Sequence, residues 1–234
     1  MARAPLLQLS DISLTYGGNP VFDKLGLSVQ QGDRVALVGR NGSGKSTLMK
    51  VMAGLVEADS GTCVVPPGIK VGYMEQEPDL SAFETLGDFA ASGLDIGEEY
   101  KVAMVAEGLK FNPETLVSSA SGGERRRAAL AKLLAEAPEL MLLDEPTNHL
   151  DIQHQLTILK GVQALPVTSL IVLHDLNQAL TCDRLAILDR GRLVALGKPL
   201  EVLTPQRLHA TFGVQAHYLT DPFDGAQILR LRAT

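Results

Sequence analysis

The sequence has no tryptophan, few aromatic residues and only two cysteines. Aromatic residues make up 4% of the 234 positions, so the core must consist mainly of aliphatic side chains, for which a 45% hydrophobic composition is sufficient. Cys63 and Cys182 lie far apart and match no metal or redox spacing, so we expect two reduced, buried thiols. The net charge of −6 lacks the basic excess of nucleic-acid-binding proteins, which makes a ribosome or RNA the less favoured partner.

Long apolar runs are also missing. No stretch approaches the roughly 20 apolar residues that span a membrane. The N-terminal MARAPLLQLSDIS contains no apolar segment of signal-peptide length. We therefore expect a soluble, cytoplasmic chain. If the protein works at a membrane, a partner must hold it there.

Short apolar runs instead alternate with amphipathic segments. LMLL (140–143) and SLIVL (169–173) are typical of strands buried on both faces, whereas GGERRRAALAKLLAEA (122–137) and IQHQLTILKGVQAL (152–165) are typical of helices. This alternation predicts an α/β fold with a largely parallel central sheet. Over residues 77–137 acids and small residues replace the β-branched runs, which predicts a small helical subdomain that includes the helix over residues 122–137.

A glycine-rich loop follows the apolar run RVALV. GRNGSGKS (39–46) fits the pattern G-x-x-x-x-G-K-[ST] and precedes a helical pattern. Its glycines let successive backbone N–H groups point at one anion, and the helix adds its positive end. Lys45 would supply a charge to the β- and γ-phosphates, and the Ser46 hydroxyl would be a ligand for Mg²⁺. The expected nucleotide-binding residues here are Gly39, Asn41, Gly42, Ser43, Gly44, Lys45, Ser46 and Thr47.

Two adjacent acids, Asp144 and Glu145, end the run LMLL. In P-loop proteins an Asp at the end of a neighbouring strand helps to hold Mg²⁺, which is the role expected for Asp144. Glu145 is placed to orient and deprotonate the water that attacks the γ-phosphate. A Mg²⁺ ion beside Asp144 would also relieve the repulsion between the two carboxylates. His174, which follows SLIVL, is a candidate contact for the γ-phosphate.

In these motifs the chain resembles the nucleotide-binding domain of the ABC ATPase superfamily. Ala120-Ser121-Gly122-Gly123-Glu124 is similar to the family signature LSGGQ. Gln76, after VGYM, is similar to the family's Q-loop glutamine, and Asn148-His149-Leu150-Asp151 to its D-loop. His174 corresponds to its switch histidine, and Tyr16 to an aromatic residue that stacks on adenine.

The resemblance covers essentially the whole chain. It implies one ATP-binding domain over residues 1–234, a P-loop NTPase of ABC type with an antiparallel N-terminal β-subdomain, a helical subdomain and a mostly parallel central sheet. It also implies ATP and Mg²⁺ as cofactors and an ATP-dependent head-to-tail homodimer. A lone protomer would then bind ATP but hydrolyse it poorly.

Residue roles follow from the same resemblance. Glu145, His174 and Gln76 would be catalytic, and Ser46, Gln76 and Asp144 would hold Mg²⁺. Two ATP molecules would be shared between protomers, so part of each site would come from the partner. The residues expected to reach the partner's ATP are Ser121, Gly122, Gly123 and Asp151.

The signature departs from LSGGQ at two positions. It has Ala120 for Leu and Glu124 for Gln, and neither change removes the serine or the glycines. Glu124 either lowers the affinity for a triphosphate by repulsion or pairs with one of the arginines 125–127. The structural alternative for these arginines is a solvated helix face.

Below the superfamily level the chain resembles two groups. Residues 1 to about 150 resemble the ABC-F proteins, soluble ATPases that act on ribosomes, through VGYMEQEP, ASGGERRRAALAKLL and ELMLLDEPTNHLD. Residues from about 147 to 234 resemble the ATPase subunits of importers for iron-siderophores, haem or cobalamin. We expect a composite with a seam within residues 140–155.

Three alternatives remain open beside the composite. The chain is a natural importer ATPase with an unusual helical subdomain, a single-domain relative of the ABC-F group, or a nucleotide binder with little turnover. The nearest natural role is the importer ATPase. A transmembrane permease subunit would then be its partner and would hold it at the cytoplasmic face of the inner membrane.

Overall fold

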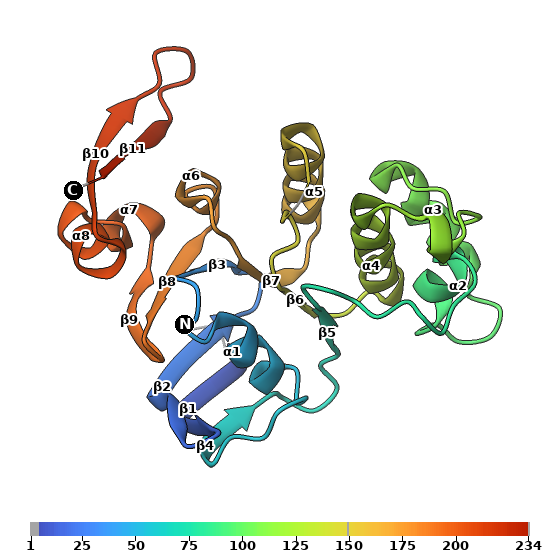
Figure 1. The fold of residues 1–234 in the computed structure, drawn as a ribbon, viewed down its shortest axis with the longest axis horizontal. Coiled ribbons are helices and arrows are strands. Elements are labelled where there is room, and N and C mark those ends of the chain that lie inside the picture. Colours follow the sequence, from blue (N-terminus) through green and yellow to red (C-terminus); the bar gives the residue numbers. More distant parts are fainter. Residues whose placement is uncertain (1–4, 149, 234) are drawn as a thin grey trace. The chain divides into compact units, whose positions relative to one another are not determined.

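The computed structural model describes residues 5–148 and 150–233, which form two compact units. The first unit comprises Met1–Pro66 and Leu170–Thr234, and the second comprises Pro67–Ser169. Each unit carries part of the expected ATP-binding machinery, and Figure 1 shows their elements coloured along the sequence.

The first unit contains a three-stranded antiparallel sheet in the order β2–β1–β4 (Figure 1). In β1 and β2 buried apolar side chains alternate over much of the length with more exposed residues, most of them polar, which is the pattern of strands with one face on a core. The expected antiparallel N-terminal subdomain is therefore confirmed. Its strands are β1 (Pro5–Tyr16), β2 (Asn19–Gln30) and β4 (Ser60–Val64).

A second set of strands in this unit carries the glycine-rich loop. The strand β3 (Arg34–Val38) is buried almost throughout and pairs in parallel with β8 (Arg184–Asp189), whose other neighbour is the antiparallel β9 (Arg192–Gly197). β7 (Thr168–Val172) begins in the second unit and becomes the other neighbour of β3. The remaining elements of the unit are α1 (Lys45–Met52), α6 (Leu176–Ala179), α7 (Pro199–Val202), α8 (Pro205–Phe212) and the hairpin of β10 (Val214–Thr220) and β11 (Gln227–Ala233).

The second unit combines a parallel strand pair with a group of helices. β5 (Val71–Met74) pairs in parallel with β6 (Leu140–Leu143), so with β3 and β8 the sheet pairing is mostly parallel, as predicted. α4 (Gly122–Glu136) packs against α2 (Leu86–Ala91) and α3 (Tyr100–Leu109). These three helices lie within the range predicted to be a helical subdomain. The unit also contains a 3-10 turn (Val117–Ser119) and α5 (Ile152–Ala164).

Two expectations from composition are tested by the structure. Both cysteines are free, but only Cys182 is buried, whereas Cys63 is exposed on β4, so the expectation of two buried thiols is wrong for Cys63. All five residues of β4, which lies at the edge of its sheet, are exposed. No helix in the described part of the chain combines the length and apolar character needed to cross a membrane.

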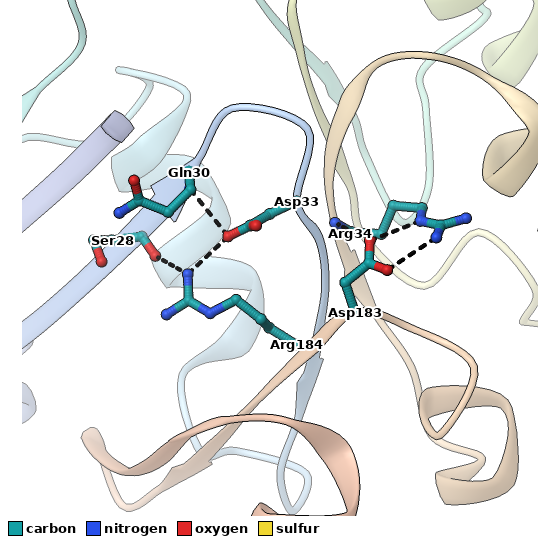
Figure 2. A network of polar contacts seen from close by, with 6 residues as sticks. All are labelled: Ser28, Gln30, Asp33, Arg34, Asp183 and Arg184. Carbon is teal, nitrogen blue, oxygen red and sulfur yellow. Dashed lines mark hydrogen bonds and ion pairs between the residues drawn. The ribbon is translucent and has the colours of Figure 1, made fainter. Parts of the chain in front are cut away.

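A polar network joins the turn after β2 to the start of β8 (Figure 2). The Arg184 guanidinium donates to the carbonyl of Ser28 (3.2 Å) and to the carboxylate of Asp33 (2.7 Å). The same carboxylate oxygen accepts the backbone N–H of Gln30 (3.2 Å). Asp33 is therefore the shared acceptor that fixes the turn leading into β3.

The second half of the network joins Arg34 to Asp183. Two guanidinium nitrogens of Arg34 donate to the two oxygens of Asp183, at 2.8 and 2.9 Å, in a bidentate pair (Figure 2). Hydrogen bonds from Arg34 hold the pKa of Asp183 below its usual range. Both halves of the network therefore anchor the start of β3, the strand that ends at the glycine-rich loop.

Asp33→Ala tests how much the shared acceptor stabilises the fold. We expect the free energy of unfolding to fall by about 1–3 kcal/mol, because Arg184 and the Gln30 N–H both lose a partner in a half-buried site. Asp23→Ala is the matched control, since Asp23 pairs with Arg192 at a site where the side chains are 54% and 71% exposed. That control should cost about 0–1 kcal/mol. Equal losses in urea denaturation would contradict this account.

Candidate functional site

The glycine-rich loop joins the buried end of β3 to α1, and its shape depends on three glycines. A side chain on Gly39 would overlap the carbonyl oxygen of Leu188, so only glycine fits beside β8. Gly42 and Gly44 have φ angles of 76° and 100°, which other residues adopt only with strain. The expected curled phosphate loop is what these positions produce.

The inside of this loop suits an anion. The Ser43 hydroxyl is buried and has no hydrogen-bond partner among the residues that the structure describes. Lys45 is also buried, and its ammonium group donates to the carbonyl oxygens of Gly39 (3.0 Å) and Arg40 (3.1 Å) across the loop. The first turn of α1 has no acid and no described side-chain cap, and the first backbone N–H groups of a helix have no acceptor within the helix itself. A phosphate group would satisfy these donors.

The other expected residues of the loop lie at its rim and in the first turn of α1. Asn41 is exposed, whereas Ser46 and Thr47 are half-buried. The turn between β8 and β9 supports the loop from behind, because the Gly191 N–H donates to the carbonyl of Ser43 (3.2 Å). Gly191 has a φ of 73° and lies against the backbone of Val21. The sequence alone does not indicate this contact between the turn and the loop.

His174 and Tyr16 belong to the same unit as the loop. The Leu173 N–H donates to the carbonyl of Leu37 in β3 (3.2 Å), which places the exposed His174 beside the strand that leads into the loop. Tyr16 lies at the end of β1 and is 60% exposed. An aromatic ring with this exposure is accessible for stacking by a planar ligand.

The two acids follow β6 in the second unit and are both buried. Asp144 is 1% exposed and Glu145 is 7% exposed. The Asp144 N–H donates to the carbonyl of Met74 (3.0 Å), and the Tyr73 hydroxyl donates to the Asp144 carboxylate (3.4 Å). Burial, and then the charge of Asp144, raise the pKa of Tyr73 well above its usual value. Tyr73, which sequence reasoning missed, therefore remains a protonated donor to this acid.

The Glu145 carboxylate is held by two amide groups. Gln76 donates its side-chain N–H to the Glu145 Oε2 atom (2.8 Å), and Asn148 donates to the same oxygen (3.0 Å). Gln76 thus lies beside the expected catalytic acid, and the other end of its amide is an oxygen of the kind that ligates Mg²⁺. The expected role of Gln76 in both catalysis and metal binding is compatible with this arrangement.

The signature serine begins α4. Ser121 is the N-cap, and its hydroxyl accepts the Glu124 N–H (3.3 Å), while the Glu124 carboxylate accepts the Ser121 N–H (2.9 Å) and hydroxyl (2.7 Å). This is a capping box, which the S-x-x-E spacing already indicates. Hydrogen bonds from Ser121 lower the pKa of Glu124. The main contacts of Glu124 are therefore with Ser121 rather than with an arginine.

Near the signature, Gly122 and Gly123 form the first turn of α4 and Asp151 is exposed just before α5. Within the expected D-loop, His149 lies outside the described residues.

The arginines after the signature do not form a solvated helix face, so that interpretation is wrong. Arg125 donates to the carbonyls of Val117 (2.9 Å) and Ala120 (3.3 Å). Arg126 is 6% exposed and donates to the backbone carbonyl of Glu145 at 2.6 Å. From the sequence, arginines 125–127 look solvent-exposed, because helical periodicity does not show that Arg126 points toward the residues after β6.

The expected site residues are thus distributed over the two units. The loop residues, Tyr16 and His174 belong to the first unit, and Gln76, Asp144, Glu145 and the signature belong to the second. The residues expected to hold Mg²⁺ come from both. Within the described chain no group of three or more His, Cys, Asp or Glu side chains is arranged to bind a metal, and the expected Mg²⁺ set contains a single carboxylate.

Comparison with known proteins identifies relatives of two kinds. Residues 22–148 match the profile of the ABC transporter family. The hemin import ATP-binding protein HmuV of Pseudomonas aeruginosa is 34% identical, and the match covers 97% of this chain and 100% of that protein. The ATP-binding protein Uup of Caulobacter vibrioides is 49% identical over 74% of this chain, and this chain spans only 28% of its length.

The fold also matches solved structures. A chain described as part of a metal-chelate type ABC transporter in an inward-facing conformation has a TM-score of 0.84 and is 23% identical, with 98% of this chain and 97% of that chain covered. At this identity the likeness concerns the fold alone.

Gly39→Ala tests whether the shape of the loop is needed for nucleotide binding. We expect ATP binding to weaken by about tenfold or more, because a displaced loop no longer directs its N–H groups at the phosphates. Gly26→Ala is the control, since a side chain there meets only the Leu9 carbonyl at an ordinary 3.6 Å. Titration with a fluorescent ATP analogue gives both affinities, and unchanged binding by Gly39→Ala would contradict the site.

Proposed function

Because the chain belongs to the ABC transporter family, we propose that it is the ATP-hydrolysing subunit of an importer for haem, cobalamin or a related metal chelate. The observation that carries this proposal is the end-to-end match with a hemin import ATP-binding protein. A cobalamin import ATP-binding protein, BtuD of Halobacterium salinarum, is 32% identical over 94% of this chain and supports the same substrate class.

ATP binding is the first step of the proposed activity. The N–H groups of the loop and the buried Lys45 ammonium group bind the phosphates, and the exposed ring of Tyr16 stacks on adenine. Ser46, Asp144 and Gln76 would hold Mg²⁺, which supplies positive charge to the phosphate oxygens. The buried Ser43 hydroxyl and the uncapped start of α1 support this assignment, because both need an acceptor.

Hydrolysis is assigned to Glu145. Its carboxylate accepts a proton from water while the water oxygen forms a bond to the γ-phosphorus, and the bond from that phosphorus to the bridging oxygen of ADP breaks. Gln76 and Asn148 orient the carboxylate through the oxygen that they share. His174 contacts the γ-phosphate. The products are ADP and inorganic phosphate.

A second protomer completes each site in this proposal. Ser121 and the two glycines at the start of α4 present N–H groups and a hydroxyl to the γ-phosphate of an ATP held by the partner. Asp151 lies at the same dimer interface. Two ATP molecules are then enclosed in a head-to-tail homodimer. A transmembrane permease subunit binds this dimer and holds it at the cytoplasmic face of the inner membrane.

A second candidate function rests on the similarity to Uup. That match favours a soluble ABC-F-like ATPase that acts on ribosomes, the alternative raised by the signature helix. The importer match covers 97% of this chain, whereas the Uup match covers 74% of it. The composite with a seam within residues 140–155 stays a proposal beside these two, and the greater coverage favours the importer function.

Glu145→Gln tests the assigned chemistry and the dimer together. We expect hydrolysis to fall by about 100-fold or more while ATP affinity is retained, because an amide binds the same neighbours but accepts no proton. With ATP the variant should accumulate as a dimer in light scattering.

Lys45→Ala, which removes the phosphate contact, is the control and should neither bind ATP nor dimerise. A Glu145→Gln chain that remains monomeric with ATP would contradict the shared sites. Association of this trapped dimer with ribosomes would favour the second candidate, and association with a permease would favour the first.

A further inference from the structure

Arg126 links the signature helix to the main chain of Glu145. It lies in the first turns of α4, is 6% exposed, and donates from Nη1 to the backbone carbonyl of Glu145 at 2.6 Å. The Asn148 N–H donates to the same carbonyl at 3.1 Å. Two donors thus fix the peptide bond that follows Glu145.

The backbone of Glu145 needs such support. Its φ is 51°, in the left-handed region that a residue with a side chain adopts only where its surroundings impose it. This conformation sets the direction in which the Glu145 side chain leaves the end of β6. Gln76 and Asn148 then orient the carboxylate itself, so the backbone and the side chain of Glu145 are held separately.

The charge of Arg126 is also suited to this place. Burial lowers its pKa, while the nearby carboxylates of Glu145, Glu77 and Asp144 favour the charged form. A guanidinium group stays protonated in proteins, so a cation is retained beside two buried acids. Arg126 therefore supplies both a hydrogen-bond donor and a positive charge to the residues after β6.

We propose that Arg126 is a positioning residue for ATP hydrolysis, which holds the main chain of Glu145 in its left-handed conformation and balances the charge of the acids after β6. It acts through Glu145 and not on the nucleotide. This inference rests on the proposed role of Glu145 as the base.

The test compares Arg126→Met and Arg126→Lys with a matched control. Methionine keeps the apolar stem and removes the donors and the charge, whereas lysine keeps the charge but not the planar guanidinium. Lys132→Met removes one positive charge from the same helix at a residue that contacts Ser92 and the Phe89 ring. Circular dichroism and thermal unfolding show whether each variant folds.

We expect Arg126→Met to lower kcat about 10- to 100-fold, because small displacements of a catalytic group reduce rates steeply. The KM for ATP should change less than about threefold, since the residue does not bind the nucleotide. Arg126→Lys should fold and lose about three- to tenfold in kcat. Lys132→Met should stay within about twofold of the unmodified chain.

A double-variant cycle separates positioning from a general structural role. If Arg126 acts through Glu145, Arg126→Met should cause little further loss of single-turnover rate in a Glu145→Gln background. If the rate losses of Arg126→Met and Glu145→Gln multiply in full in the double variant, the inference is overturned. A kcat of Arg126→Met within twofold of the unmodified chain would also overturn it. If the methionine variant does not fold, an unchanged kcat in Arg126→Lys overturns it instead. Absence of ATP turnover in the unmodified chain would contradict the proposed function, which is a different outcome.

Discussion

The burial of two adjacent carboxylates at the end of β6 is the constraint on which the second unit depends. Asp144 and Glu145 are almost fully removed from solvent, and buried charge is costly unless it is paired and hydrogen-bonded. Hydrogen-bond donors and a cation from several elements offset this cost. Tyr73 donates to Asp144, two side-chain amides donate to Glu145, and Arg126 brings a cation from α4. The fold thus supplies donors to both carboxylates at a place that is largely removed from solvent.

Under the proposed function the first unit has the opposite requirement, because its glycine-rich loop would hold an anion with backbone groups. Gly39 has to be glycine because β8 lies against it, and the turn at Gly191 braces the loop through Ser43. The polar network of the turn before β3 anchors the start of the strand that leads into the loop. The donors are thus preorganised before any nucleotide arrives, which reduces the cost of ordering them on binding.

Much of this organisation is readable in the sequence, and the omissions have physical causes. A phosphate loop, a strand ending in two acids and a serine that begins a helix depend on local spacing, so motif and fold class were predictable. The inward turn of Arg126 and the packing of Gly191 on the loop depend on contacts between residues far apart in the chain. The capping box of Ser121 and Glu124 is different, because its spacing was present and was interpreted only as a departure from LSGGQ.

In the proposed mechanism two protomers share their ATP sites. ATP turnover measured against protein concentration tests it most directly. If Ser121 of one protomer completes the site of the other, the rate per protomer should rise with concentration and the total rate should be second order until the dimer saturates. A total rate strictly proportional to concentration from the lowest levels, with light scattering showing only monomer in the presence of ATP, would contradict it.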